Sequence, residues 1–210
     1  MSKRFGFFTW LGAILLVLAV AILAYVFLVR PWHMRWGARD EEISAPLPGD
    51  GWAPAGAEVS TRSITIHAPV SQVWPWIAQL GQERGGFYSY DWLENLFLAN
   101  MRNADRLLPE TQRLQVGDRF SYMKDGPPGT YGEILLVEPE HTLVVGAGGW
   151  TWVLEPAGEG ATRLIVRYPF TVGAGLLGKF FYYAWFEPAH FVMESGMMMG
   201  IKERAEAMGR

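Results

Sequence analysis

The residues best suited to chemistry lie near the end of the chain, where His190 and Glu194 are four positions apart. The apolar residues from 188 to 207 recur with a period of 3.6, which predicts a helix with both side chains on one face. The rest of that face is apolar and comprises Phe191, Met193, Met197, Met198, Ile201, Ala205 and Met208. Polar groups in this setting could orient the polar head of a ligand or act as an acid/base pair. A buried hydrogen bond closed by Arg62, Arg84 or Arg167 is the alternative, because buried ionisable groups must be paired in either case.

Other kinds of chemical site have little support in the sequence. The spacing Glu187-x-x-His190 has the form of one half of a di-iron carboxylate site, but it occurs once, so we expect no metal and no cofactor. The chain has no Cys, which excludes disulfides, thiolate nucleophiles and Cys-ligated metals. It also has no GxSxG elbow, no P-loop and no HExxH motif. A nucleophile-based hydrolase is therefore not indicated.

Apolar and aromatic side chains around His190 and Glu194 could form the wall of a binding cavity. The flexible thioethers of the methionines suit variable apolar ligands, although a plain core explains them at least as well. Alternation along the expected strands turns a set of aromatic side chains toward the same interior. The expected ligand-binding residues are His190, Glu194, Met193, Met197, Met198, Tyr88, Phe120, Tyr122, Trp150, Trp152 and Tyr168.

The segment from Gly85 to Asn95 is rich in glycine and tyrosine. Its two glycines permit close approach of the backbone, and Tyr88 and Tyr90 could place phenols at the mouth of a cavity. A loop packed by its own aromatic rings is the alternative. Asp91 and Glu94 have the spacing of a capping box, which explains both acids without a functional role.

Periodicity predicts one strand, two helices, a run of strands and a last helix as the elements that position these residues. Ser71 is the expected N-cap of the first helix. The alternation in the last strand turns Arg163 and Arg167 away from the interior. The expected strands cover residues 61–66, 116–123, 131–137, 142–146, 150–155 and 162–170, and the first and last helices cover 72–80 and 188–207, with a short helix after Asp91.

The N-terminal segment is a predicted membrane anchor. Residues 5–29 carry no charge, and 25 residues at a rise of 1.5 Å make a helix of about 37 Å, which can span a bilayer. A cleavable signal peptide is the competing interpretation, because Ala19-Val20-Ala21 has the small-x-small form, but the apolar run continues beyond it. Basic residues flank the run on both sides, so the side of the membrane stays open. Residues 40–60 are rich in Pro, Gly and acid, which predicts a tether, so we divide the chain into 1–39, 40–60 and 61–208.

Charge excludes a further class of partner. The net charge of the chain is −3, but residues 1–39 hold five basic residues and no acidic one, so residues 40–210 hold 13 basic and 21 acidic residues. A body of that charge is repelled by a phosphate backbone. We therefore expect no nucleic acid among its partners.

The order of these elements resembles the START-like helix-grip superfamily, also called SRPBCC or the polyketide cyclase/dehydrase and lipid transport group. The resemblance covers residues 61–208 and depends on Ile64 to Pro69 before Val73-Trp74-Pro75-Trp76, then on the hairpin at residues 156–161 and the last helix. A membrane-anchored subgroup has segments similar to residues 30–37 and 85–92. The resemblance implies an α+β fold in which a curved antiparallel sheet wraps around a long C-terminal helix, here after one transmembrane helix.

The resemblance also implies a cavity for an apolar or amphipathic small molecule, without implying catalysis. We therefore expect a single-pass membrane protein, anchored by residues 5–29, that binds a hydrophobic or lipid-like molecule. A cyclase or dehydratase-like enzyme with His190 and Glu194 in proton transfer is one alternative, and a non-catalytic interaction module with a packed interior is another. The aromatic run from Phe180 to Phe186 either contacts the bilayer interface or covers the cavity.

Overall fold

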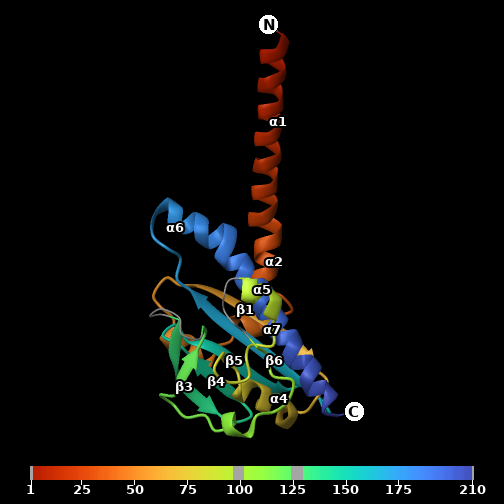
Figure 1. Ribbon diagram of the computed structural model, residues 1–210, viewed down its shortest axis with the longest axis vertical. Coiled ribbons are helices and arrows are strands. Elements are labelled where there is room, and N and C mark those ends of the chain that lie inside the picture. Colours follow the sequence, from red (N-terminus) through yellow and green to blue (C-terminus); the bar gives the residue numbers. More distant parts are fainter. Residues whose placement is uncertain (1, 97–101, 124–129, 210) are drawn as a thin grey trace.

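A computed structural model describes residues 2–96, 102–123 and 130–209, and the side chains of residues 9–92 and 95 within the first of these ranges. Its most extended part is an N-terminal helix that projects from the body (Figure 1). This helix comprises α1 (Ser2–Ala24), the π-helical turn η1 (Tyr25–Val29) and α2 (Arg30–Met34). It is long and apolar enough over Thr9–Met34 to cross a membrane, and its apolar side chains are largely exposed.

The body is built on one antiparallel sheet of six strands in the order β1-β6-β5-β4-β3-β2. The strands are β1 (Glu58–Ile66), β2 (Arg119–Ser121), β3 (Tyr131–Glu138), β4 (Thr142–Val145), β5 (Trp150–Pro156) and β6 (Thr162–Phe170). Strand β1 lies at one edge of the sheet and pairs with the much later β6, with Arg62 opposite Val166. The predicted run of strands is confirmed, although β1 begins three residues before the predicted start at Thr61.

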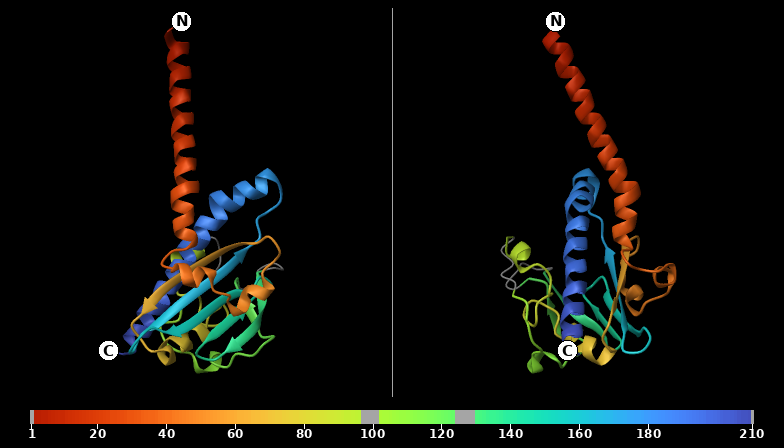
Figure 2. Two further views of the ribbon diagram at one scale, coloured as in Figure 1. Left: turned by 180° about the vertical axis from the view of Figure 1, so that it is seen from behind. Right: turned by 90° about the vertical axis from the view of Figure 1, so that its right-hand side faces the viewer.

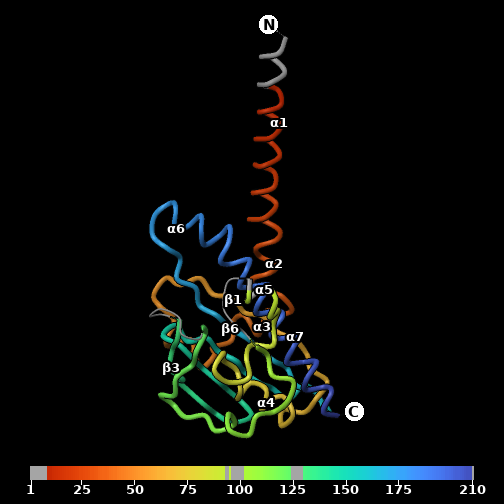
Figure 3. Tube along the Cα trace, in the orientation of Figure 1, coloured from red at the N-terminus to blue at the C-terminus, as the bar shows by residue number. Residues whose placement is uncertain are grey.

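The last helix and the helices between β1 and β2 lie on one face of this sheet. The long α7 (Glu187–Ala207) lies along it, and the segment that carries α5 (Asp91–Leu96) and η3 (Pro109–Thr111) covers the other side of α7 (Figure 2, right). Helix α4 (Val70–Ala78) packs against α7. It begins at Val70 with Pro69 as its N-cap, and no side chain caps it, so the expected cap at Ser71 is wrong. Figure 3 shows the Cα trace of the chain through these helices and the segments that connect them.

Side chains alternate across the strands as the pattern predicts. Arg62 faces α7, whereas its neighbours Thr61 and Ser63 face the outer side of the sheet. Arg163 and Arg167 also face outward, as expected. Because all five are buried, the outer face must supply polar partners for the two arginines.

Those partners come from the segment that was expected to be a tether. Residues 40–57 lie on the outer face and contain α3 (Asp40–Ser44) and the 3-10 helix η2 (Pro48–Trp52). Glu42 accepts hydrogen bonds from Arg163 Nε at 2.6 Å and from Ser63 Oγ at 2.9 Å. Arg167 donates to Asp50 and to the carbonyls of residues 42, 43 and 45. The segment is therefore packed against the body, because the two arginines bind its carboxylates and carbonyls.

The Glu42 contact predicts a pH dependence of stability. Burial raises the pKa of this carboxyl, but hydrogen bonds from Arg163, the Arg39 backbone and Ser63 outweigh burial and lower the pKa from 4.5 to about 2. A lowered pKa stabilises the fold above pH 4.5, and this contribution is lost as the pH falls toward 2. We expect Glu42→Gln to remove about 3 kcal/mol at pH 7 and almost nothing near pH 2, as measured by guanidinium unfolding in detergent micelles.

The matched control is Glu110→Gln, because Glu110 is an exposed carboxyl in the short helix η3. Its substitution should change the free energy of unfolding by less than about 0.5 kcal/mol at either pH. An equal loss for Glu42→Gln at pH 7 and pH 2 would contradict the assignment.

Candidate functional site

The candidate site lies between the concave side of the sheet and α7. Glu194 is 2% exposed there and forms an ion pair with Arg62, which is fully buried. The indole Nε1 of Trp150 donates to the other carboxylate oxygen of Glu194 at 3.0 Å. Of the three arginines proposed to close this interaction, the structure selects Arg62. The alternating pattern of β1 places Arg62 inside, since Ile64 and Ile66 share its face.

His190 lies one turn before Glu194 and contacts Arg62 rather than Glu194. Its Nδ1 is 3.4 Å from Arg62 Nη1. Burial and then the charge of Arg62 hold the pKa of His190 well below its usual range, so the ring is neutral at pH 7. A guanidinium can only donate, so Nδ1 is the acceptor and the ring proton belongs on Nε2. The expected acid/base pair of His190 and Glu194 is therefore bridged by an arginine.

Aromatic rings fill the interior around these groups. Trp150 and Trp152 have ring centroids 4.3 Å apart, and the His190 ring lies 4.3 Å from that of Tyr168. Phe120 packs against Trp152 at 6.2 Å and against Tyr122 at 5.4 Å. Burial raises the pKa of Tyr122 and of Tyr168, so both phenols stay protonated at neutral pH. The structure thus brings five of the six predicted aromatic residues, all except Tyr88, together as one packed cluster.

The remaining predicted residues take different places. Met197 and Met198 are buried in the core, and Met193 is half-buried. Tyr88 is buried on the opposite side of α7, and its hydroxyl donates to the carbonyl of Trp76 at 3.1 Å. It has a left-handed backbone with φ of 59°, and a Cβ added to Gly200 would overlap its backbone, so this glycine allows the close approach.

Two hollows, of about 340 and 410 Å³, lie on that same side of α7, away from the sheet. Tyr88 is the only predicted ligand-binding residue that lines either of them. The exposed Tyr90 also lines the first hollow, while Asp91 accepts a hydrogen bond from the Asn103 side chain. The predicted capping role of Glu94 falls on a side chain outside the described part of the chain.

Five buried side-chain nitrogen and oxygen atoms of the described residues have no hydrogen-bond partner, and two of these atoms are donors on strands that face α7. They are Trp152 Nε1 and Arg62 Nη2, on side chains that are both fully buried. Val166 lies opposite Arg62 on one side and opposite Trp152 on the other, so the two donors belong to one row across β1, β6 and β5. An unpaired buried donor costs about 1 to 3 kcal/mol. A ligand oxygen between α7 and this row could accept from them.

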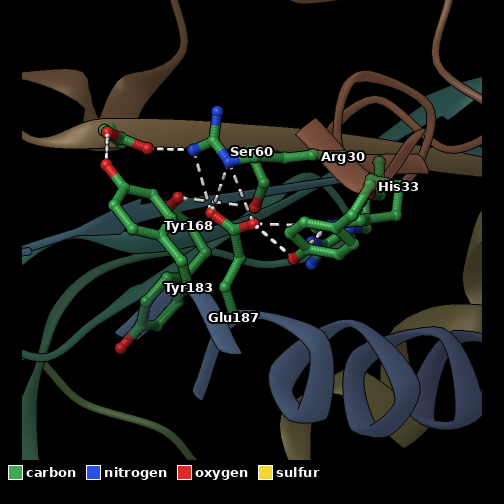
Figure 4. A network of polar contacts seen from close by, with 9 residues as sticks. Arg30, His33, Ser60, Tyr168, Tyr183 and Glu187 are labelled. Carbon is green, nitrogen blue, oxygen red and sulfur yellow. Dashed lines mark hydrogen bonds and ion pairs between the residues drawn. The ribbon is translucent and has the colours of Figure 1, made fainter. Parts of the chain in front are cut away.

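Sequence reasoning missed a second polar cluster, next to the first, where the N-terminal helix joins the body. The carboxylate of Glu187 is fully buried and accepts from Arg30 Nε at 3.1 Å and Nη2 at 2.9 Å, and from the Tyr25 hydroxyl at 3.1 Å. His33 Nε2 lies 3.3 Å from the same carboxylate. Figure 4 shows Arg30, His33 and Tyr183 gathered around Glu187. The carbonyl of His33 accepts from Arg62 Nε at 2.7 Å, which connects this junction cluster to the interior site.

No family model and no curated protein matches the sequence. Solved structures are similar at low identity. The KanY protein is 16% identical with a TM-score of 0.46, covering 72% of this chain and 99% of its own. CalC, a self-sacrificing resistance protein from Micromonospora echinospora, is 15% identical with a TM-score of 0.43, covering 72% and 96%. The Zhui aromatase/cyclase from a Streptomyces species is 14% identical with a TM-score of 0.41, covering 73% and 96%.

These likenesses concern the fold alone. The assignment itself depends on the topology of the chain: β1 precedes two short helices, five more antiparallel strands follow, and a long last helix lies along the sheet. The body of this protein has the helix-grip fold.

Proposed function

We propose that this chain is a membrane-anchored protein that binds a hydrophobic or amphipathic small molecule between its sheet and α7. The observation that carries the proposal is the row of unpaired donors, Trp152 Nε1 and Arg62 Nη2, in an interior lined mainly by apolar and aromatic side chains. A ligand with an apolar body and a carbonyl, carboxyl or hydroxyl head has the matching chemistry. Its oxygen would accept hydrogen bonds from the two donors. Its apolar body would contact the aromatic rings in place of some of the contacts that these rings now make with one another.

The proposed ligand-binding set keeps the predicted residues and adds Arg62. His190, Glu194 and Arg62 orient the polar head, and the aromatic rings of Trp150, Trp152, Phe120, Tyr122 and Tyr168 surround the body with Met193, Met197 and Met198, while Tyr88 supports α7 from behind. Because the rings are in contact with one another, ligand entry requires some of them to rotate. Burial of the ligand then stabilises the complex by about 25 cal/mol for each Å² of apolar surface removed from water.

The N-terminal helix supports the membrane part of the proposal. An apolar helix over Thr9–Met34 is long enough to span a bilayer, and Glu187 fixes its base to the start of α7. The binding interior is thereby held close to a supply of lipid-soluble molecules. Residues 1–39 serve as the anchor and residues 61–208 as the binding domain in this proposal.

Native mass spectrometry of the full chain, released from detergent micelles after incubation with a bacterial membrane extract, tests the proposal. We expect an added small-molecule mass in the wild-type protein. Trp152→Phe keeps a ring in place but removes the N–H, so the affinity should fall about tenfold, equivalent to about 1.4 kcal/mol for one hydrogen bond, and the occupancy should fall with it at subsaturating amounts of extract. The matched control is Trp92→Phe, since Trp92 is 70% exposed, and it should bind as the wild type does.

Two results would contradict the proposal. A bare protein mass after incubation would favour the interaction module with a packed interior. Equal occupancy in Trp152→Phe and the wild type would remove the indole from the site. A bound mass that is absent from the membrane extract itself, and that is lost in His190→Ala, would instead favour the cyclase or dehydratase-like activity.

A further inference from the structure

The short helix α6 (Gly175–Phe181) exposes an unusual amount of apolar surface. Its Leu176, Leu177, Phe180 and Phe181 are 90%, 82%, 69% and 57% exposed. The turn that follows, η4 (Tyr182–Phe186), adds Trp185 at 52%. Contiguous exposed apolar surface of this kind marks an interaction site, because leaving it in water is unfavourable.

The position of α6 indicates what covers this surface. It lies at the end of the body from which α1 projects, beside the base of that helix, in each of the three ribbon views (Figures 1 and 2). The neighbouring residues of η1 also expose apolar side chains, with Phe27 at 69% and Leu28 at 70%. A bilayer that surrounds α1 would therefore meet α6 at the same end of the molecule.

Polar contacts join η4, which follows α6, to α2 at the base of the N-terminal helix. The Tyr183 hydroxyl donates to Glu58 at 2.6 Å, and Arg30 forms ion pairs with both Glu58 and Glu187. The Arg30 guanidinium also lies over the Tyr183 ring, 5.2 Å from its centroid. Since these contacts join η4 directly to α2, the height of α6 relative to the N-terminal helix is set by the fold.

The composition of the segment suits a membrane interface. Residues 171–186 contain no acidic residue, and their single cation is the exposed Lys179, which can extend toward lipid phosphates. Trp185 in η4 and Trp32 in α2 are each about half exposed. Tryptophan is enriched at the level of lipid headgroups. Seven residues make a helix of about 10 Å, far too short to span a bilayer.

We propose that α6 is inserted into the interfacial layer of the leaflet from which the N-terminal helix emerges, as a second and non-spanning membrane contact. This inference depends on the proposed membrane anchorage by α1. It also gives α7 a membrane-bound end, because η4 continues without a break into α7 and Phe186 contacts both Phe170 and His190. If the aromatic rings at this end rotate, the interior between the sheet and α7 would open toward the lipid phase.

The absence of cysteine allows a direct test by site-directed spin labelling. Nitroxides at Leu177→Cys, Leu18→Cys and Val116→Cys are compared in the full chain, reconstituted in vesicles of phosphatidylcholine and phosphatidylglycerol. Leu18 reports the anchor, and Val116, which is 65% exposed on the body, is the aqueous control. The ratio of accessibility to oxygen over accessibility to a water-soluble nickel chelate should be several-fold higher at Leu177 than at Val116. Like the ratio at Leu18, it should indicate a lipid environment.

Each other outcome overturns the inference in a distinguishable way. Equal ratios at Leu177 and Val116, with Leu18 in lipid, would place α6 in water and leave the anchor intact. Aqueous ratios at all three sites would overturn membrane anchorage as well. Low accessibility of Leu177 to both reagents would show a protein contact, and dipolar broadening would then distinguish a second copy of the chain from packing against its own body.

Discussion

Arg62→Met should lower the free energy of unfolding by about 3 to 5 kcal/mol, the range found when one partner of a buried ion pair is removed. Arg62 is fully buried and supports three groups at once: the Glu194 carboxylate, His190 Nδ1 and the carbonyl of His33. Without the guanidinium, the buried Glu194 carboxylate keeps one hydrogen bond among the described residues, the one from Trp150. Guanidinium unfolding of the full chain in detergent micelles, followed by tryptophan fluorescence, measures the loss.

The size of this loss should depend on pH in a specific direction. Burial raises the pKa of Glu194, and Arg62 together with Trp150 offsets part of the rise. In Arg62→Met the pKa of Glu194 rises further above its unfolded value, so the folded state binds the proton more tightly than the unfolded state. Stability therefore falls as the pH rises above 4.5, and the loss relative to wild type should be larger at pH 8 than at pH 5.

Two variants control the interpretation. Arg119→Met removes a solvent-exposed arginine whose nearest carboxylate, on Glu83, is 3.6 Å away, and it should cost less than about 1 kcal/mol. The double variant Arg62→Met, Glu194→Leu removes both charges of this buried pair and should recover much of the loss. Similar losses in the Arg62→Met and Arg119→Met variants would show that Arg62 contributes no more than an exposed cation does.

The candidate site was predictable where local pattern determines it. The alternation of β1 and β6 places Arg62 inside and Arg163 outside, and the period of α7 brings Glu194 to the face that meets the sheet. Each of these placements follows from one element and its own periodicity. The choice of Arg62 among three arginines was not determined, because it depends on which strand lies opposite α7.

The tether and the junction cluster were not predictable, because their stabilising contacts are distant in sequence. Residues 40–57 have a composition typical of a linker, and their order comes from Glu42 and Asp50 binding arginines more than 100 positions later. Glu187 likewise meets Arg30 across 157 positions. No local spacing signals such pairs. Strand boundaries were off for a related reason, since β1 extends to Glu58 only because Phe170 lies opposite it.

Glu187→Ala should have the second large effect, at the base of the N-terminal helix. The substitution leaves Arg30, Tyr25 and His33 without their shared acceptor, in a place where the carboxylate was fully buried. We expect a loss of about 3 kcal/mol, at the lower end of the range for buried pairs, because Arg30 is partly exposed and keeps Glu58. The helix should also become loosely attached to the body.

Spin-label distances measure that attachment in the chain without native cysteine. With nitroxides at Leu23→Cys in α1 and Val116→Cys on the body, the wild-type protein should give a narrow distance distribution and Glu187→Ala a broad one. Glu203→Ala, an exposed acid on the same helix α7, is the matched control and should keep the narrow distribution. An unchanged distribution in Glu187→Ala would show that the junction cluster does not position the helix.

The junction should also respond to acid with a defined sign. Burial raises the pKa of Glu187, but hydrogen bonds from His33 and Arg30 and the charge of Arg30 lower it below its ordinary value overall. A lowered pKa keeps the carboxylate ionised, so the contact contributes fully above pH 4.5 and weakens only as the pH falls through the lower folded-state value. Glu187→Gln retains one acceptor oxygen but no charge. It should therefore show an intermediate loss at pH 7 and a weaker response to acid than the wild type.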